Sequence, residues 1–272
     1  GVVLEPRLWP EKYGVLTATA DYWKINQTDL VGIFGATNQL IMDYYLRQVG
    51  SSNENVVRAD PTEEQIADAQ QAGLAPVGDI ISIDDVYLNM QPRESEGMDY
   101  RLHYSLRHTP IGDFTWTLNA SQWLKMYQEA NDDYQLLLDG LRDGVISGVS
   151  VGGVEELVRR NGRPEWKVTS TVTWRAGAWT TGFYSSYVSD YFDTSANMVD
   201  TGDYWFVDDW LTHNLYVQYE FDEGPMSGTR LRIGAKNITD EEPPLANARF
   251  GYDGRLHSNR GRWWYATIRK EF

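Results

Sequence analysis

Aromatic, cationic and imidazole side chains lie between the regular segments of the sequence, and these residues are the best candidates for chemistry. Aromatic rings provide flat apolar faces on which carbohydrates and other rings can stack. Packing within loops and anchoring at a membrane interface are the alternative roles for such residues. The candidates for ligand contact are Tyr134, Tyr191, Tyr204, Trp205, Arg249, Tyr252, Arg255 and His257.

The sequence contains no pattern that predicts an enzyme. It has no G-x-S-x-G or H-E-x-x-H motif and no Cys, and the glycines from Gly148 to Gly153 lack the Gly-Lys-Ser/Thr ending of a phosphate loop. The acidic stretch Asp193–Asp209 lacks the regular ligand spacing of a calcium loop. His103 is expected to face inward as a hydrogen-bonding group. The scattered His residues form no ligand pair, and we predict no catalytic residue, metal site or cofactor; they are His103, His108, His213 and His257.

Composition limits the remaining classes of protein. The formal net charge of -15 argues against nucleic-acid binding, which needs clustered Lys and Arg. No stretch approaches the ~20 apolar residues of a transmembrane helix. The 11 Trp and 17 Tyr are a heavy aromatic load that interface girdles or carbohydrate stacking would explain.

Alternating apolar and polar residues predict long antiparallel strands that would position the candidates. In the last segment, Trp264, Ala266 and Ile268 share one face, while Trp263 and Tyr265 belong to the other. Strands of this length exceed the ~5 to 6 residues typical of soluble sheets and suit a tilted membrane crossing. Helical spacing is limited to three short segments between strands. These are Asn38–Val49, a helix that starts within Asp60–Glu63 with an Asp or Thr cap and is closed by Gly73, and Tyr134–Leu141.

The connections between the predicted strands alternate strictly in length. The short ones are Pro6–Gly14, Thr109–Asp113, Ala176–Ala178 and Asp222–Gly228, and the long ones are Gly35–Asp79, Asn131–Pro164, Thr194–Asp209 and Glu241–Asn259. Outer-membrane barrels have short periplasmic turns and long extracellular loops, whereas a soluble sandwich has no reason to separate them. The sequence therefore predicts an all-β, antiparallel transmembrane barrel with short helices in its extracellular loops.

The segment RIGAKNITDEEPP resembles the penultimate strand and loop entry of TonB-dependent outer-membrane receptors, in which a Gly-x-x-Asn-apolar-x-Asp pattern precedes prolines. The matching residues are Asn237, Asp240, Pro243 and Pro244. The segments Tyr22–Ile25, Val86–Asn89 and Glu96–Tyr100 are similar to other strands of the family, and Phe272 fits its terminal aromatic residue. Lys270 departs from the pattern, because the family more often has an aromatic residue there.

The resemblance implies a barrel of roughly 22 strands around a plug. We count eight full strands and part of a ninth, and therefore expect residues 1–272 to be the C-terminal portion of such a barrel, with the plug and the TonB-binding segment in a preceding part. The resemblance implies active import across the bacterial outer membrane of an iron chelate, cobalamin or oligosaccharide. The implied partners are the TonB complex, outer-membrane lipid and lipopolysaccharide. A small self-contained barrel with a structural or adhesive role is the alternative.

Overall fold

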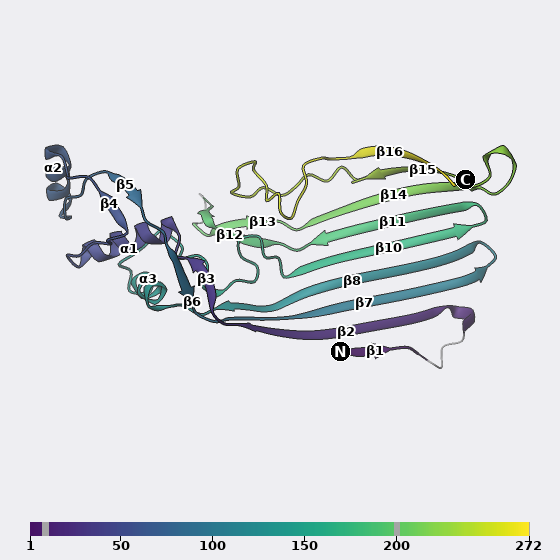
Figure 1. Cartoon of the computed structure of the whole chain (residues 1–272), viewed down its shortest axis with the longest axis horizontal. Helices are drawn as coiled ribbons and strands as arrows, with labels where there is room; N and C mark the ends of the chain where they lie inside the picture. The colour runs from purple at the N-terminus through teal and green to yellow at the C-terminus, as the bar shows by residue number, and fades with distance from the viewer. Residues whose placement is uncertain (7–10, 199–201, 272) are drawn as a thin grey trace. The chain divides into compact units, whose positions relative to one another are not determined.

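An antiparallel sheet in which the strands pair in chain order dominates the structure, a computed structural model that describes residues 1–6, 11–198 and 202–271 (Figure 1). Along its path lie β1 (Val2–Leu4), β2 (Val15–Gln27), β7 (Arg93–Thr109), β8 (Gly112–Gln128), β10 (Trp166–Ala176), β11 (Trp179–Val188), β14 (Trp210–Phe221), β15 (Thr229–Lys236) and β16 (Trp263–Lys270). A tenth strand, β9 (Glu155–Glu156), pairs with β8 beside this path. Over the described residues, the path confirms the predicted eight strands and the part of a ninth.

The register places apolar side chains in rows across one face of the sheet. Trp116 pairs with Val172, which pairs with Phe183, and Phe183 pairs with Leu215 on β14. The row continues through Ala235 to Trp264, which is 67% exposed. Polar residues alternate with these along each strand, as expected of a barrel wall with one face toward lipid.

Short and long connections lie at opposite ends of the sheet, as predicted. Consecutive strands pair antiparallel, so alternate connections must emerge at opposite ends, and the short turns lie together on the right in Figure 1. The tightest turns use glycine at positive φ, with Gly112 at 112° and Gly177 at 54°. The other short connections contain η1 (Glu11–Tyr13) and η2 (Gly224–Met226).

The long connections carry the remaining elements. Between β2 and β7 lie β3 (Leu30–Ile33), α1 (Ala36–Gln48), β4 (Val56–Arg58), α2 (Glu63–Ala72), β5 (Ile80–Ile83) and β6 (Tyr87–Met90). Between β8 and β10 lie α3 (Asp132–Arg142) and β9, and between β11 and β14 lie β12 (Tyr191–Asn197) and β13 (Tyr204–Val207). The three predicted helical segments are confirmed. No helix in the described part of the chain is long and apolar enough to cross a membrane.

The chain forms two compact units. Unit 1 comprises Gly1–Lys24, Ser95–Lys125 and Val158–Phe272, and unit 2 comprises Ile25–Glu94 and Met126–Leu157. Unit 2 is thus built from two of the predicted long loops. Its separate core explains this division, because loops without buried apolar residues would not fold into a unit of their own.

The core of unit 2 combines residues from both of its segments. Phe34 and Ile41 from the first segment pack with Tyr134 and Leu137 from the second, and Leu137 is fully buried. A buried ion pair supports α1, in which Asp43 is 2.9 Å from Arg58 on β4. Of the two predicted caps of α2, Asp60 and Thr62, the structure uses Thr62, which forms a capping box with Gln65. The helix ends at Gly73 in the left-handed conformation.

Candidate ligand-binding site

The long loop between β15 and β16 folds back so that its two ends are joined. Asn237 and Asp240 begin the loop with positive φ values of 49° and 61°, a conformation that Asn and Asp tolerate better than most residues. The Asn237 side chain accepts a hydrogen bond from the N–H of Glu241 at 2.9 Å. Asp240 accepts one from the N–H of Arg262, immediately before β16. The family-like motif therefore sets the loop entry and fixes its exit.

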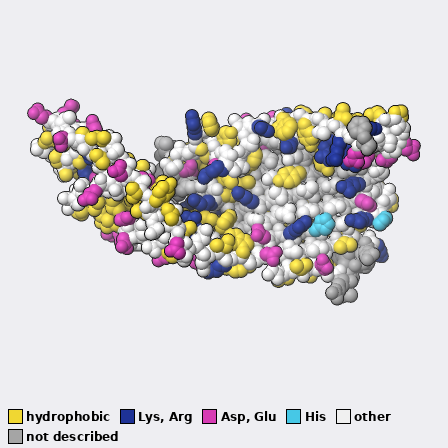
Figure 2. All heavy atoms as spheres, viewed as in Figure 1, with side chains coloured by type: hydrophobic (Ala, Val, Ile, Leu, Met, Phe, Trp, Pro, Cys, Tyr) yellow, Lys and Arg dark blue, Asp and Glu magenta, His cyan; other side chains and the backbone are white. Residues whose placement is uncertain are grey.

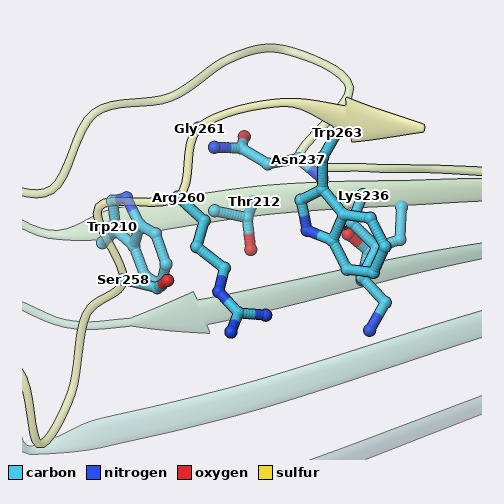
Figure 3. Close-up of a pocket in the computed structure, with 9 residues that line it drawn as sticks. Trp210, Thr212, Lys236, Asn237, Ser258, Arg260, Gly261 and Trp263 are labelled. Atoms are coloured by element: carbon cyan, nitrogen blue, oxygen red, sulfur yellow. Dashed lines mark hydrogen bonds between the residues drawn. The ribbon is translucent and has the colours of Figure 1, made fainter. Parts of the chain in front are cut away.

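A pocket of about 210 Å³ lies where this loop meets the polar face of β14, β15 and β16 (Figure 3). Lys236 and Trp263 are register partners on β15 and β16, so their side chains lie next to each other and form one wall of the pocket. Arg260 comes from the loop, and its side chain extends between Trp210 and Trp263 in Figure 3. The lining comprises Trp210, Thr212, Asn214, Lys236, Asn237, Ser258, Arg260, Gly261 and Trp263.

Two cations give the pocket a positive character in a chain of net charge -15. Lys236 Nζ lies 4.9 Å from the centroid of the Trp263 ring, which is a cation–π contact. Among the described residues, neither Lys236 nor Arg260 has a carboxylate within ion-pair distance, and the lining contains no Asp or Glu. Two uncompensated cations beside two indole rings can bind an anion that also has a flat apolar face.

A buried aromatic cluster supports the Trp210 wall of the pocket. His257 is 5% exposed, and its ring lies parallel to that of Tyr191, with the centroids 6.5 Å apart. The Trp210 ring meets His257 edge-on at 5.5 Å. Neither ring nitrogen of His257 has a hydrogen-bond partner in the described structure, and burial lowers the pKa of His257. His257 is therefore held as a neutral packing group next to Trp210.

Asp253 and Arg255 form the charged edge of the same cluster. Arg255 donates to Asp253 Oδ1 through Nε at 2.9 Å and to Oδ2 through Nη2 at 2.6 Å. This guanidinium lowers the pKa of Asp253, which remains ionised although it is only 7% exposed. Burial, followed by the nearby Asp253 carboxylate, raises the pKa of Tyr191. The pair thus fixes the loop segment that carries His257.

The structure brings four predicted ligand contacts together and leaves the other four apart. The four that lie together are Tyr191, Trp205, Arg255 and His257. Trp205 and Leu256 pack against the buried cluster that contains Tyr191, and Leu256 lies in the sequence between Arg255 and His257. Tyr134 is in the core of unit 2, 3% exposed, with its ring 4.7 Å from Phe34. The remaining candidates lie on loop surfaces or strand β13; they are Tyr204, Arg249 and Tyr252. None of the predicted contacts lines the pocket, and their ligand roles stay predictions.

The sequence reasoning missed the residues of the pocket. Lys236 and Trp263 were visible as members of alternating strands, but their meeting depends on the β15–β16 register. Arg260 was part of a predicted loop with no indication of where it points. The family-like Pro243 and Pro244 are half-buried in the loop after Asp240. Phe272 lies outside the described residues.

His103 forms a side-chain hydrogen bond on the polar face of the sheet, as the sequence predicted. Its Nδ1 lies 3.0 Å from Oγ1 of Thr117 on β8. Thr117 pairs with Thr171 on β10, so the contact is on the face opposite the Trp116 row. The hydrogen bond places His103 on the polar face of the sheet, and its inward orientation stays a prediction.

Comparison with known proteins gives matches in structure only. No family model matches the chain, and no curated protein is similar in sequence. The siderophore receptor PirA from Acinetobacter baumannii superposes with a TM-score of 0.52 and 12% identity, over 94% of this chain and 30% of that chain. The ferric-catecholate import receptor Fiu from E. coli K12 (TM-score 0.49, 12% identity, 97% and 26% covered) and the outer membrane transporter YddB from Escherichia coli (0.49, 10%, 93% and 30%) are also similar.

The likeness to PirA concerns the fold, and the chain spans about a third of the length of that receptor. It agrees with the antiparallel sheet in which the strands pair in chain order. The predicted outer-membrane location is that of the proteins that share this architecture. The chain has the barrel-wall fold of TonB-dependent outer-membrane receptors.

Proposed function

We propose that this chain is part of a receptor that imports an anionic small ligand across the outer membrane. The observation that carries the proposal is the pair of uncompensated cations, Lys236 and Arg260, beside the indole rings of Trp210 and Trp263. The pocket opens on the polar face at the long-loop end of the sheet, where a ligand arriving from outside would meet the barrel. The fold shared with a siderophore receptor supports transport as the general activity.

An anionic iron chelate fits this pocket better than the other ligand classes predicted from the resemblance. A neutral oligosaccharide would stack on Trp210 or Trp263 but would leave two cations without a counter-charge. A chelate whose metal is held by aromatic oxygen donors supplies both negative charge and flat rings. Pairing with Lys236 and Arg260 would then add charge-assisted hydrogen bonds to the stacking.

Transport against a gradient requires energy, and we propose that the TonB complex supplies it through a plug outside this chain. The apolar row from Trp116 to Trp264 would contact outer-membrane lipid, with lipopolysaccharide at the outer leaflet. The sheet itself would act as a fixed wall that holds the pocket while the plug moves. None of these roles requires a catalytic residue in the chain.

Ligand titration of the full-length receptor tests the pocket. The purified protein would be titrated with a trianionic ferric tris-catecholate, with anionic ferric citrate and with a neutral malto-oligosaccharide. Lys236→Gln and Arg260→Gln should each raise the Kd of the anionic chelate about tenfold, the loss of one charge-assisted contact of ~1.5 kcal/mol. Lys12→Gln is the matched control, because Lys12 also lies 4.9 Å from an aromatic ring, that of Tyr13, but outside the pocket. Sugar binding that neither pocket variant changes would contradict the anion assignment.

Energy coupling is tested separately in cells. Uptake of the radiolabelled iron chelate that binds should stop when tonB is deleted or the proton gradient is collapsed, while binding at the cell surface persists. Uptake that continues under both conditions would identify a passive pore instead. The two arms distinguish a failed ligand assignment from a failed transport mechanism.

A further inference from the structure

Nearly all of the net negative charge of the chain belongs to unit 2. Its two segments contain 18 Asp and Glu against four Arg and no Lys, a net charge of -14. Unit 1 contains 21 acidic and 20 basic residues, a net charge of -1, although it is the larger unit. The acidity is therefore a property of the loop-built unit and not of the sheet.

The four arginines of unit 2, which the net charge of -14 already includes, are each held in a local contact. Arg58 is engaged by the buried Asp43, and Arg142 pairs with Asp139 of its own helix. Arg47 donates to the carbonyl oxygen of Ala75, and Arg93 donates to the side chain of Gln128. Each guanidinium is thus used in local structure. The unit presents a field that attracts cations and repels anions.

An exposed apolar face accompanies the charge on the two-stranded ribbon of β3 and β6. Leu88 and Met90 of β6 pack against the core of unit 2. The opposite face carries Val31 at 65% exposure, Ile33 at 50% and Tyr87 at 81%. Ile33 and Tyr87 are register partners, so their side chains adjoin. We call Val31, Ile33 and Tyr87 the ribbon face.

Exposed Asp residues precede both strands of the ribbon in the sequence. Asp29 is exposed immediately before β3, and Asp84 is exposed shortly before β6. Asp85 accepts a hydrogen bond from the N–H of Gly35 at 3.1 Å, which holds the Ile33–Tyr87 end of the ribbon. Figure 2 shows acidic and apolar side chains interspersed over the part of the molecule that contains α1 and α2. An apolar patch bordered by one sign of charge is typical of a protein-binding surface.

We propose that the ribbon face is a docking surface for a basic polypeptide segment that carries a row of apolar side chains. Complementarity to a unit of net charge -14 determines the sign of the partner, and the aromatic ring of Tyr87 with the branched chains of Val31 and Ile33 provides the apolar contact. The pocket at Arg260 selects an anion, so the two sites choose partners of opposite charge. The docking proposal does not depend on the proposed transport function.

A peptide titration of the full-length protein in detergent tests the ribbon face. The probe is a fluorescent peptide of alternating Lys and Val, compared with a peptide of alternating Glu and Val of equal length. Ile33→Thr with Tyr87→Thr should raise the Kd of the Lys peptide tenfold or more, since both residues are exposed and Thr suits a strand. Ile81→Thr is the matched control, because Ile81 is 68% exposed on the other ribbon of unit 2 and should change the Kd less than twofold.

A second pair of variants separates docking from general attraction by charge. Asp29→Asn with Asp84→Asn should raise the Kd at least fivefold, whereas Asp68→Asn with Asp143→Asn removes the same charge elsewhere in unit 2 and should change it less than twofold. Equal losses in the two pairs would overturn the proposal in favour of non-specific attraction. Failure of the Lys peptide to bind, or binding that is indifferent to the threonine variants, would also overturn it. Circular dichroism and limited proteolysis confirm that each variant is folded.

Discussion

The carboxylate of Asp240 accepts a hydrogen bond from the backbone N–H of Arg262 at 2.6 Å, which closes the loop of residues 241–261. Arg262 Nη1 also donates to the carbonyl oxygen of Ile238 at 3.3 Å. The Arg262 guanidinium also lies 3.6 Å from the same carboxylate. We call this contact between Asp240 and Arg262 the clasp. It holds together the end of the loop that leaves β15 and the end that enters β16, and Arg260 lies two residues before Arg262. The geometry of the pocket therefore depends on a residue that does not line it.

Removing the clasp should loosen the loop without unfolding the sheet. Asp240→Ala eliminates the hydrogen bond from the Arg262 N–H, which should destabilise the closed loop by ~1 to 3 kcal/mol. We expect cleavage between residues 241 and 261 by an added protease to become about tenfold faster. Asp240→Asn keeps an acceptor oxygen and a side chain suited to positive φ, and should stay within twofold of the parent rate. Equal rates for both variants would show that the clasp does not hold the loop.

Acidification should open the aromatic cluster around His257. Burial and the charge of Lys167 lower its pKa, and the opposing attraction of Asp253 is smaller than the effect of burial. A His whose folded pKa is lowered contributes stability that is complete above its unfolded value of about 6.5 and is lost as the pH falls below it. Asp253, with a lowered pKa, remains ionised throughout this range.

Hydrogen exchange measures this opening. Between pH 7.5 and pH 5, the segments containing Tyr191 and His257 should lose protection after correction for the intrinsic rate. His257→Phe keeps a ring of similar shape against Trp210 and should abolish the pH dependence. If the Phe variant keeps the same pH dependence, another group is responsible for the opening.

Adding a methyl group at Gly234 should disturb the polar face of the sheet. A Cβ there would lie 2.6 Å from the ring of Tyr265, the register partner of Gly234 on β16. Gly234→Ala should therefore reduce the free energy of unfolding by ~1 to 3 kcal/mol, the range for overpacking. Tyr265→Ser in the same protein should restore most of the loss. Gly152→Ala, where no atom lies within 4 Å, is the control, and thermal unfolding followed by gel mobility is the measurement.

The ion pair between Asp43 and Arg58 tests whether unit 2 unfolds separately. Arg58→Leu leaves the carboxylate of Asp43, which is 2% exposed, buried without its partner, at a cost of ~3 to 5 kcal/mol. We expect proteolysis confined to residues 25–94 and 126–157 while the strands of unit 1 stay protected. Arg142→Leu breaks the exposed pair with Asp139 and should cost less than ~1 kcal/mol. Simultaneous loss of protection in both units would contradict the division.

The sequence was sufficient to predict the strands and helices that are determined by neighbouring residues. The alternation of strand residues and the length of each connection were enough to predict the sheet. The segment Asp60–Glu63 and Gly73 were enough to predict the ends of α2, although the choice between an Asp and a Thr cap needed the structure. Tyr134 shows where this fails. Its place in a loop made it a ligand candidate, whereas the packing of α3 against α1 buries it. The pocket could not be predicted for a similar reason. Lys236 and Arg260 come together only through the β15–β16 register and the fold of the loop.

The boundaries of unit 2 imply that its two segments must be exchanged together in any chimera. The chain enters or leaves the unit after Lys24, Glu94, Lys125 and Leu157, so no single cut separates it from the sheet. Phe34 and Leu137, from different segments, share one core. If one loop were exchanged with that of a related receptor, core side chains from two different proteins would have to pack together. Recombination can therefore transplant the two loops as a pair, while a swap of either alone produces a chimera that misfolds at this position.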